Sequence, residues 1–456
     1  MTRSFLEITN EFPGYDDLVE PQKQVPLSLR DKLSIFRIIG ICCSLAAFQI
    51  AKWVKYTLQI LLMRKLGVRE SIMALITITD PLSRFIVQPY IEILSDNCKL
   101  KFGRRRPFIL AGGIGIVISF LCIFLMKLDS YMQSGIFVFL LSISLLILNF
   151  SLQILRYPSL QIVNDLVPQK QQAIANLISS LTSNTTAFLI NLINGFLYNA
   201  LEHWIFFYSL IAISILITIT LIAGKEEPLL IAKDNQNVNQ FSSIFSTMKL
   251  MPNPILKIAI IYSLCWFSYY PFLLECTDYF GADQSGSYSG VSYGIFTFSI
   301  INLFVLIYSP FHEKIVQKFG MKNLLAVSMC IVTICLALVW LPIPKLAGLM
   351  ILAPMGVCEM IFNSIPFIIV SMNVPEELVS IYNGVFSTLA SFSQVLSSFL
   401  VFALFGEICR QKVVIMGIGF ISAFGAAFMC RYIMLPKSDS AVMEPLAPSS
   451  DYYNYN

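Results

Sequence analysis

Long apolar segments alternate with short polar segments along most of the chain. A helix that crosses a lipid bilayer needs about 20 mostly apolar residues. Twelve segments satisfy this condition, at residues 35–63, 71–94, 108–127, 135–157, 173–198, 203–223, 255–275, 289–309, 323–341, 346–371, 382–405 and 412–434. The pattern therefore predicts an all-α membrane protein with twelve transmembrane helices.

The longest polar break, at residues 224–254, lies between the sixth and seventh apolar segments. Six spans therefore precede a polar linker and six follow it. The predicted organisation is a cytoplasmic tail (1–34), a six-helix bundle (35–223), a cytoplasmic linker (224–254), a second six-helix bundle (255–434) and a second cytoplasmic tail (435–456).

The amino-acid composition excludes several other classes of protein. Of the 456 residues, 56% are hydrophobic and 13% are charged, whereas soluble proteins carry about 25% charged residues. A soluble enzyme, a disordered chain and a nucleic-acid-binding protein are excluded. Most cysteines lie in apolar segments, and the histidines are His203 and His312, so the residues for a metal site or a Ser–His hydrolase are missing. We expect no enzymatic activity, no cofactor and no metal.

Lys and Arg residues in the loops predict the orientation, because cytoplasmic loops are enriched in both. With both termini in the cytoplasm, 21 of the 31 Lys and Arg residues fall on the cytoplasmic side and seven on the opposite side. The basic loop at residues 64–69 is the exception to this distribution. The charges predict a multi-pass protein of the plasma membrane or an endomembrane, with both termini cytoplasmic.

A short motif recurs in the two halves of the chain. Residues 96–105 contain an acid, then Lys-Phe-Gly, then a base, and residues 313–322 repeat these types at the same offsets, 217 positions later. Both copies follow the second span of a half, which is typical of a transporter built from two repeats with a binding site between them. We predict a cytoplasmic gate that breaks when the halves move, formed by Asp96, Gly103, Arg104 and Arg105 and, in the second half, Glu313 and Gly320.

The gate loop and the seventh span resemble a known family. Residues 88–89, 95–98 and 102–109 in the first half, and 266–281 in the second, resemble the major facilitator superfamily. The resemblance is narrower to its glycoside–pentoside–hexuronide branch, which contains the plant sucrose–proton symporters. It implies two six-helix bundles that alternate access to a midplane site, and secondary transport of a sugar.

Polar residues inside the spans are candidates for that site, because burying an ionisable group in a membrane is costly. Amides and hydroxyls are neutral donors and acceptors that suit sugar hydroxyls. The candidates for substrate binding are Lys55, Gln59, Asn149, Gln153, Arg156 and Asn363. The candidates for proton coupling are Glu359, Asp278 and Asp80.

Asp80 has two alternative partners. Asp80 and Arg84 are four residues apart and can pair along one helix, whereas Lys52 and Lys55 of the first span could also face Asp80. We favour the pair along the helix. For Lys55, we favour a pore-lining role over a structural ion pair.

The resemblance also implies a difference in proton coupling. Alignment with the sucrose symporters places Asn149 where they carry a membrane-embedded aspartate, which is taken to be their proton and sugar site. An amide cannot titrate, and Glu359 is then the deepest carboxylate without a base nearby in the sequence. We predict uncoupled transport or coupling through Glu359, and slightly favour the uncoupled case.

The sequence as a whole predicts a transporter that moves a sugar or glycoside by alternating access, with or without protons. An anionic organic solute is the alternative substrate, because Lys55 and Arg156 bring positive charge to the expected site. A non-transporting sensor or scaffold is the alternative of another class, and the repeated gate loop favours transport. The expected partners are a small-molecule solute and the lipid bilayer, without nucleic acid.

Overall fold

The computed structural model describes residues 32–128, 134–225, 248, 251–281, 290–341, 343–374, 376–406 and 419–433, and all regular elements within these ranges are helices. The predicted tails and most of the predicted linker lie outside them. The first half contains α1 (Ile35–Lys65), α2 (Glu70–Asp96), α3 (Arg106–Leu128), α4 (Ser134–Leu166), η3 (Gln169–Gln171), α5 (Gln172–Leu201), η4 (Glu202–Trp204) and α6 (Ile205–Ala223). The second half contains α8 (Asn253–Gly281), α9 (Val291–Tyr308), η5 (Ser309–Phe311), α10 (His312–Phe319), α11 (Met321–Leu338), α12 (Lys345–Leu352), α13 (Met355–Asn373), α14 (Glu376–Ser398), η6 (Phe399–Gly406), α17 (Gly419–Met429) and η7 (Cys430–Tyr432).

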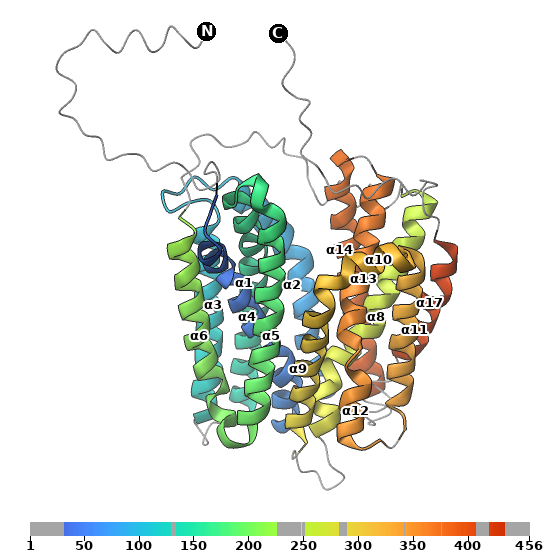
Figure 1. Cartoon of the computed structure of the whole chain (residues 1–456). Coiled ribbons are helices and arrows are strands. Elements are labelled where there is room, and N and C mark those ends of the chain that lie inside the picture. The colour runs from blue at the N-terminus through green and yellow to red at the C-terminus, as the bar shows by residue number, and fades with distance from the viewer. Residues whose placement is uncertain are drawn as a thin grey trace, which may run out of the picture.

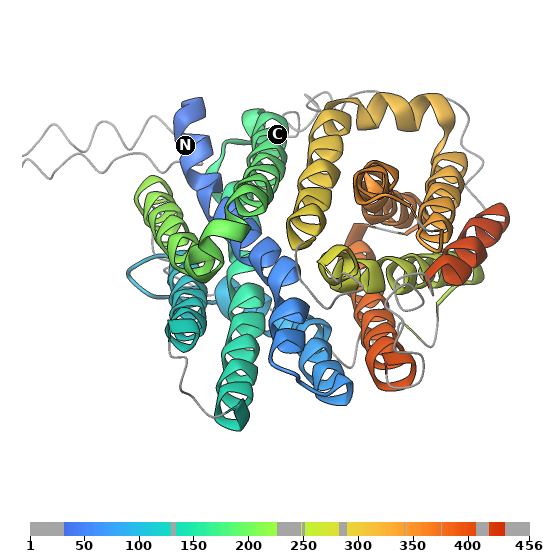
Figure 2. The same cartoon turned by 90° about the horizontal axis from the view of Figure 1, so that it is seen from below.

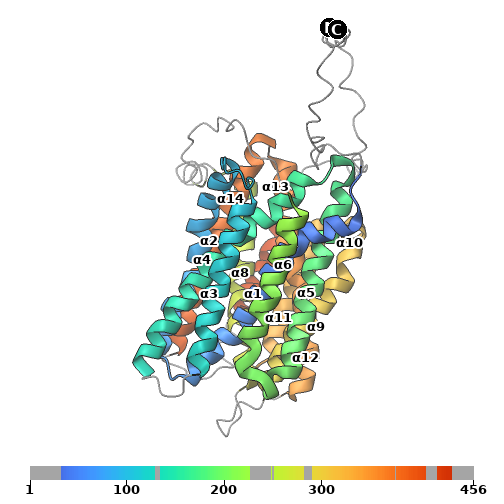
Figure 3. The same ribbon diagram turned by 90° about the vertical axis from the view of Figure 1, so that its left-hand side faces the viewer.

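The helices form two bundles that stand side by side (Figure 1). In the first bundle α1 packs against α4, α5 and α6, and in the second α8 packs against α9, α13, α14 and α17. Figure 3 shows the outer side of the first bundle, where α3 and α6 lie nearest to the viewer. Figure 2 shows α10 lying along one edge of the second bundle, crosswise to the long helices.

Nine stretches of the described residues are long and apolar enough to cross a membrane. One of them, Gln169–Ala223, has 55 residues and contains both α5 and α6. α2 is not among the nine, and it carries Asp80, Arg84 and Glu92 within its length. The twelfth predicted span is described only from residue 419 onward. The structure therefore confirms an all-α membrane protein, and the count of twelve helices stays a prediction.

Local sequence signals set several helix ends. Ser34 caps the start of α1, where its side chain accepts a hydrogen bond of 3.4 Å from the backbone N–H of Arg37. Gly103 and Gly320 follow α2 and α10 with φ values of 116° and 76°. L-residues with a side chain rarely adopt these angles, so glycine is required at both turns.

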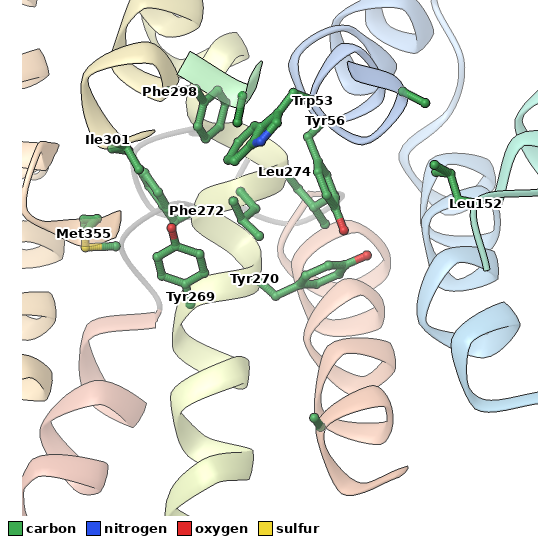
Figure 4. Packing of buried hydrophobic residues seen from close by; sticks show 14 of the residues in the cluster. Trp53, Tyr56, Leu152, Tyr269, Tyr270, Phe272, Leu274, Phe298, Ile301 and Met355 are labelled. Carbon is green, nitrogen blue, oxygen red and sulfur yellow. The ribbon is translucent and has the colours of Figure 1, made fainter. Parts of the chain in front are cut away.

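The two bundles contact each other where α1 meets α8, where α2 meets α14 and η6, and where α5 meets α9. The backbone of α5 approaches the ring of Phe296 so closely that a Cβ atom on Gly195 would lie 2.7 Å from it. Phe196 packs against the same ring, with centroids 4.9 Å apart. An aromatic cluster lies between α1, α8 and α9, where the ring centroids of Trp53 and Phe298 are 5.2 Å apart (Figure 4). Close apolar packing therefore joins the bundles at these places.

Candidate functional site

A buried ion pair joins α1 and α2 in the first bundle. The Nζ atom of Lys55 lies 2.8 Å from Oδ1 of Asp80, and the two side chains are 2% and 4% exposed. The hydroxyl of Tyr56 donates a hydrogen bond of 2.8 Å to Oδ2 of the same carboxylate. Arg84 Nη2 lies 3.9 Å from that oxygen. Asp80 therefore contacts both of the expected partners, and Lys55 is the closer one.

Asn149 of α4 extends this cluster to a third helix. Its Oδ1 accepts a hydrogen bond of 3.1 Å from Lys55 Nζ, and its Nδ2 donates one of 2.7 Å to Thr79 Oγ1. The backbone carbonyl of Asn149 accepts a hydrogen bond of 3.3 Å from Ser83 Oγ. Lys55 and Asn149, both candidates for substrate binding, thus hold α1, α2 and α4 together.

Arg84 reaches from α2 to the second bundle. Its Nη1 donates a hydrogen bond of 3.2 Å to Oε1 of Gln394 on α14, and its Cζ lies 6.0 Å from the centroid of the Trp266 ring on α8. The sequence places Gln394 on a polar helical face, but no pattern pairs it with a residue 310 positions away. Donor, acceptor and aromatic groups from both bundles meet here.

Glu359 and Asn363 lie on α13, in the second bundle, and both are partly exposed. Tyr269 donates a hydrogen bond of 2.8 Å from its hydroxyl to Oε2 of Glu359, and Tyr262 donates one of 3.3 Å to Oδ1 of Asn363. Lys52 of α1 carries the opposite charge to Glu359 and interacts with it electrostatically. These two opposite charges belong to different bundles.

The remaining binding candidates are Gln59, Gln153 and Arg156. Gln59 and Gln153 are buried, and Oε1 of Gln153 has no hydrogen-bond partner within the described ranges. Arg156 and Lys52 are partly exposed. In the part of the chain that the structure describes, neither cation forms an ion pair or a donated hydrogen bond, although Lys52 lies 4.9 Å from the Trp53 ring centroid.

The third coupling candidate, Asp278, belongs to an ion cluster near one end of the molecule. Arg64, in the last turn of α1, contacts Asp278 of α8, and its Nη2 lies 3.0 Å from Oε1 of Glu275. Its Nε lies 3.5 Å from Oε1 of Glu70. Glu275 and Asp278 have fully buried side chains. We call Arg64, Glu275 and Asp278 the end cluster, and it joins the two bundles.

The end cluster was missed in the sequence, although one signal pointed to it. The basic loop at residues 64–69 is an exception to the Lys and Arg distribution. Next to Arg64, Lys65 also has partners in the structure: its Nζ lies 2.9 Å from Oε2 of Glu202 and 2.9 Å from the Tyr198 hydroxyl. The structure places both bases in the last turn of α1, and both have acidic partners.

The first copy of the gate motif forms an ion network within one bundle. Arg105 contacts Asp96, and it also lies 2.7 Å from Ser95 Oγ and 2.9 Å from Oδ2 of Asp165. Arg104 lies 2.6 Å from the same oxygen of Asp165. Asp165 of α4 is a member that the motif did not include. These contacts connect the region of α2 and α3 to α4 within the first bundle.

The second copy shares the turn but not the network. Gly320 has a positive φ, as Gly103 does. Glu313 is exposed and accepts a hydrogen bond of 3.4 Å from Gln317. Among the described residues Glu313 forms no ion pair. The repeated spacing thus preserves the glycine turn in both halves.

Comparisons with known proteins agree with this architecture. The family model described as Major Facilitator Superfamily matches residues 38–398. Sucrose transport protein SUC4 of Arabidopsis thaliana is 26% identical over 361 residues, 69% of this chain and 69% of that protein. Sucrose transport protein SUT5 of Oryza sativa subsp. indica is 25% identical over 267 residues, 48% of this chain and 47% of that protein. General alpha-glucoside permease of Schizosaccharomyces pombe is 25% identical over 240 residues, 47% of this chain and 43% of that protein.

Solved structures show the same fold. The peptide transporter POT in complex with sulfate matches with a TM-score of 0.69 and 11% identity, covering 89% of this chain and 96% of that one. A mutant form of the nucleoside transporter NupG matches with a TM-score of 0.66 and 13% identity, covering 87% of this chain and 99% of that one. The chain belongs to the Major Facilitator Superfamily: it is a multi-pass membrane transporter and a divergent member that resembles the sucrose transporters.

Proposed function

We propose that the protein is a secondary transporter that moves a sugar or glycoside across a membrane by alternating access. The observation that carries this proposal is the meeting of Arg84, Gln394 and Trp266 between the bundles. Amide and guanidinium groups can bind sugar hydroxyls, and an aromatic ring can pack against the apolar face of a sugar. The sucrose transport proteins and the alpha-glucoside permease among its relatives support this substrate class.

The movement that we propose is a rocking of the bundle at residues 35–223 against the bundle at 255–434. The end cluster joins the bundles at the end of α1 and α8, and the Asp96–Arg105 network lies at the opposite end of α2. With both termini in the cytoplasm, the end cluster closes the non-cytoplasmic side. Its ion pairs must break before the solute can reach the site from that side.

We infer that transport is uncoupled from protons. Asp80 forms an ion pair with the ammonium of Lys55 and accepts a hydrogen bond from the hydroxyl of Tyr56. Protonating Asp80 therefore requires breaking a buried ion pair. Asn149, which accepts a hydrogen bond from Lys55, is an amide and cannot titrate. Glu359, which is partly exposed and bonded to Tyr269, carries the coupled alternative.

The test uses purified protein in vesicles that contain a pH-sensitive dye. We expect uptake of labelled sucrose, maltose or glucose that equilibrates without proton entry. Proton entry that is lost in Glu359→Gln would replace the uncoupled proposal by the coupled one, and entry that survives this change would contradict both. Correctly folded protein that transports none of these sugars or their glycosides would contradict sugar transport and favour a sensor or scaffold.

A further inference from the structure

Helix α10, which carries most of the second copy of the gate motif, lies crosswise to the long helices (Figure 2). Through η5 it joins the end of α9 to the start of α11, and each of these two helices has 18 residues. A helix of this size is about 27 Å long, and the hydrocarbon core of a bilayer is about 30 Å thick. The ends of α9 and α11 therefore place α10 close to one surface of the membrane.

Two residues fix which side of α10 faces the protein. The Nε2 atom of His312 lies 2.9 Å from the Ser364 hydroxyl of α13, and its Nδ1 lies 3.1 Å from the Tyr308 hydroxyl of α9. Val316, four residues after His312, is 4% exposed. Residues four apart are separated by about 40° around a helix, so His312 and Val316 share one side. That side packs against the bundle.

The other three sides of α10 differ in chemistry, when residues are placed at about 100° intervals around the helix. The apolar side consists of Phe311, Ile315 and Phe319, the basic side of Lys314 and Lys318, and the polar side of Glu313 and Gln317. Phe311 and Phe319 are 54% and 57% exposed. Both lysines are exposed, and in the ranges that the structure describes neither forms an ion pair. The basic side lies opposite the side that packs against the bundle.

The direction of the chain decides which way the apolar side faces. Figures 1 and 2 show α10 running from α9 to α11 along the outer edge of the second bundle. Successive residues of a right-handed helix turn clockwise when they are followed along the chain. With His312 and Val316 toward the bundle, the apolar side therefore faces the middle of the membrane. The basic side faces outward, and the polar side faces water.

The bases in the two copies of the gate motif have different surroundings. In the first copy Arg105 is 4% exposed and contacts Asp96. In the second copy Lys322 stands at the corresponding position, and its Nζ donates a hydrogen bond of 2.7 Å to the backbone carbonyl of Arg431. The two lysines of the basic side have no such contact within the described part of the chain, so their charges are available to a group outside the protein.

We propose that α10 anchors the second bundle to the membrane surface, and that its basic side binds the headgroups of anionic lipids. Helices that lie in the surface of a bilayer bury an apolar side at the boundary of the acyl chains and carry lysines beside it. The apolar stem of a lysine lets its ammonium reach the phosphates. With both termini in the cytoplasm, this surface is the cytoplasmic leaflet, which contains anionic lipids. The proposal goes beyond the proposed function, because it does not depend on the solute.

The experiment measures hydrogen–deuterium exchange of the full-length protein in nanodiscs of phosphatidylcholine, with and without phosphatidylserine. Two lysines close to an anionic surface favour contact with it by about 30-fold. Peptides that cover α10 should therefore exchange more slowly with phosphatidylserine, by up to about 30-fold. High salt should reduce this difference, because it screens exposed charges.

The variants test the two sides of α10 separately. Replacing Lys314 and Lys318 by Gln together should remove most of the difference between the two bilayers, whereas replacing both by Arg should keep it. Replacing Phe311 and Phe319 by Ser should speed the exchange of α10 in both bilayers. The matched control is Lys101→Gln, which removes an exposed lysine of the first copy and should leave the difference at α10 unchanged.

Equal exchange of α10 in the two bilayers would overturn the proposal. The same would follow if the slowing survived the double Gln variant, or if Lys101→Gln removed it equally. Slowing by inorganic phosphate in phosphatidylcholine alone would show that a free anion suffices, and slowing only in nanodiscs with two protein molecules would show that a second copy covers α10. Either result would also overturn the lipid anchor.

Discussion

Replacing Arg64 by Gln should open the end of the molecule at which α1 and α8 finish. In the structure, the guanidinium of Arg64 contacts the carboxylates of Asp278 and Glu275 in the other bundle. The two carboxylates are 0% exposed, and the Arg64 side chain is 9% exposed. The substitution would leave both buried acids without the cation that joins them to the first bundle.

The magnitude follows from the burial of these groups. Removing one partner of a buried ion pair costs about 3–5 kcal/mol, and we take the lower end, about 3 kcal/mol, because Arg64 is not fully buried. The contact joins the two bundles, so the cost falls on the arrangement in which this end is closed. A change of about 3 kcal/mol shifts the ratio of closed to open arrangements by about 100-fold.

Hydrogen–deuterium exchange in detergent or nanodiscs measures this shift. Peptides that cover the ends of α1 and α8 should exchange faster in Arg64→Gln, by up to about 100-fold if opening limits exchange. The matched control is Lys65→Gln. Its ion pair with Glu202 lies within the first bundle, and its side chains are 28% and 24% exposed, so it is worth about 1 kcal/mol or less.

A third variant keeps the reasoning testable if Arg64→Gln is unstable. Replacing Arg64 and Glu275 by Gln and Asp278 by Asn removes all three charges of the end cluster and should restore most of the protection. Equal exchange in Arg64→Gln and Lys65→Gln would refute the role of the end cluster in holding the bundles closed.

Three further changes probe the rest of the site. Lys55→Gln should destabilise the protein by about 3–5 kcal/mol because it leaves Asp80 buried without its closest cation, and adding Asp80→Asn should recover most of the loss. Equal melting temperatures for the single and double variants would contradict the ion pair. Asp165→Asn should impair uptake more than Asp96→Asn because Asp165 binds two arginines. Both variants should reach the membrane in near-normal amounts, and unchanged flux in both would count against the gate. Asn149→Asp should make uptake depend on pH, because it places a second carboxylate beside Lys55; an unchanged pH profile of uptake in proteoliposomes would show that the alignment of the fourth span is incorrect.

The helical faces could be predicted from the sequence, because apolar segments and their polar residues follow the period of a helix. The first span shows Lys55 on a polar face, and the fourth shows Asn149 and Arg156 together. Which residue of another helix each of them meets depends on the rotation, tilt and depth of that helix. The hydrogen bond between Lys55 and Asn149 joins residues 94 positions apart, and no local pattern specifies it.

The end cluster illustrates a second limit. Arg64 contacts residues 211 and 214 positions later in the chain, and each acid is an ordinary polar residue near the end of its helix. In the gate motif, part of the structure could be predicted: the repeated spacing suggests a glycine turn in both halves, and Gly103 and Gly320 both have positive φ values. The spacing does not suggest that Arg105 binds Asp165. Repeated sequence preserves backbone geometry, whereas ion partners can differ between the halves.

The close contact between Gly195 and Phe296 has a consequence for the evolution of the chain. Any side chain at residue 195 would bring a Cβ atom to 2.7 Å from the ring, and Phe196 packs on that ring and limits its retreat. A substitution at residue 195 or at residue 296 is therefore constrained by the residue at the other position. Homologues with a residue larger than Gly at position 195 should carry a residue smaller than Phe at position 296. Residues 195 and 296 should therefore covary although they are far apart in the sequence.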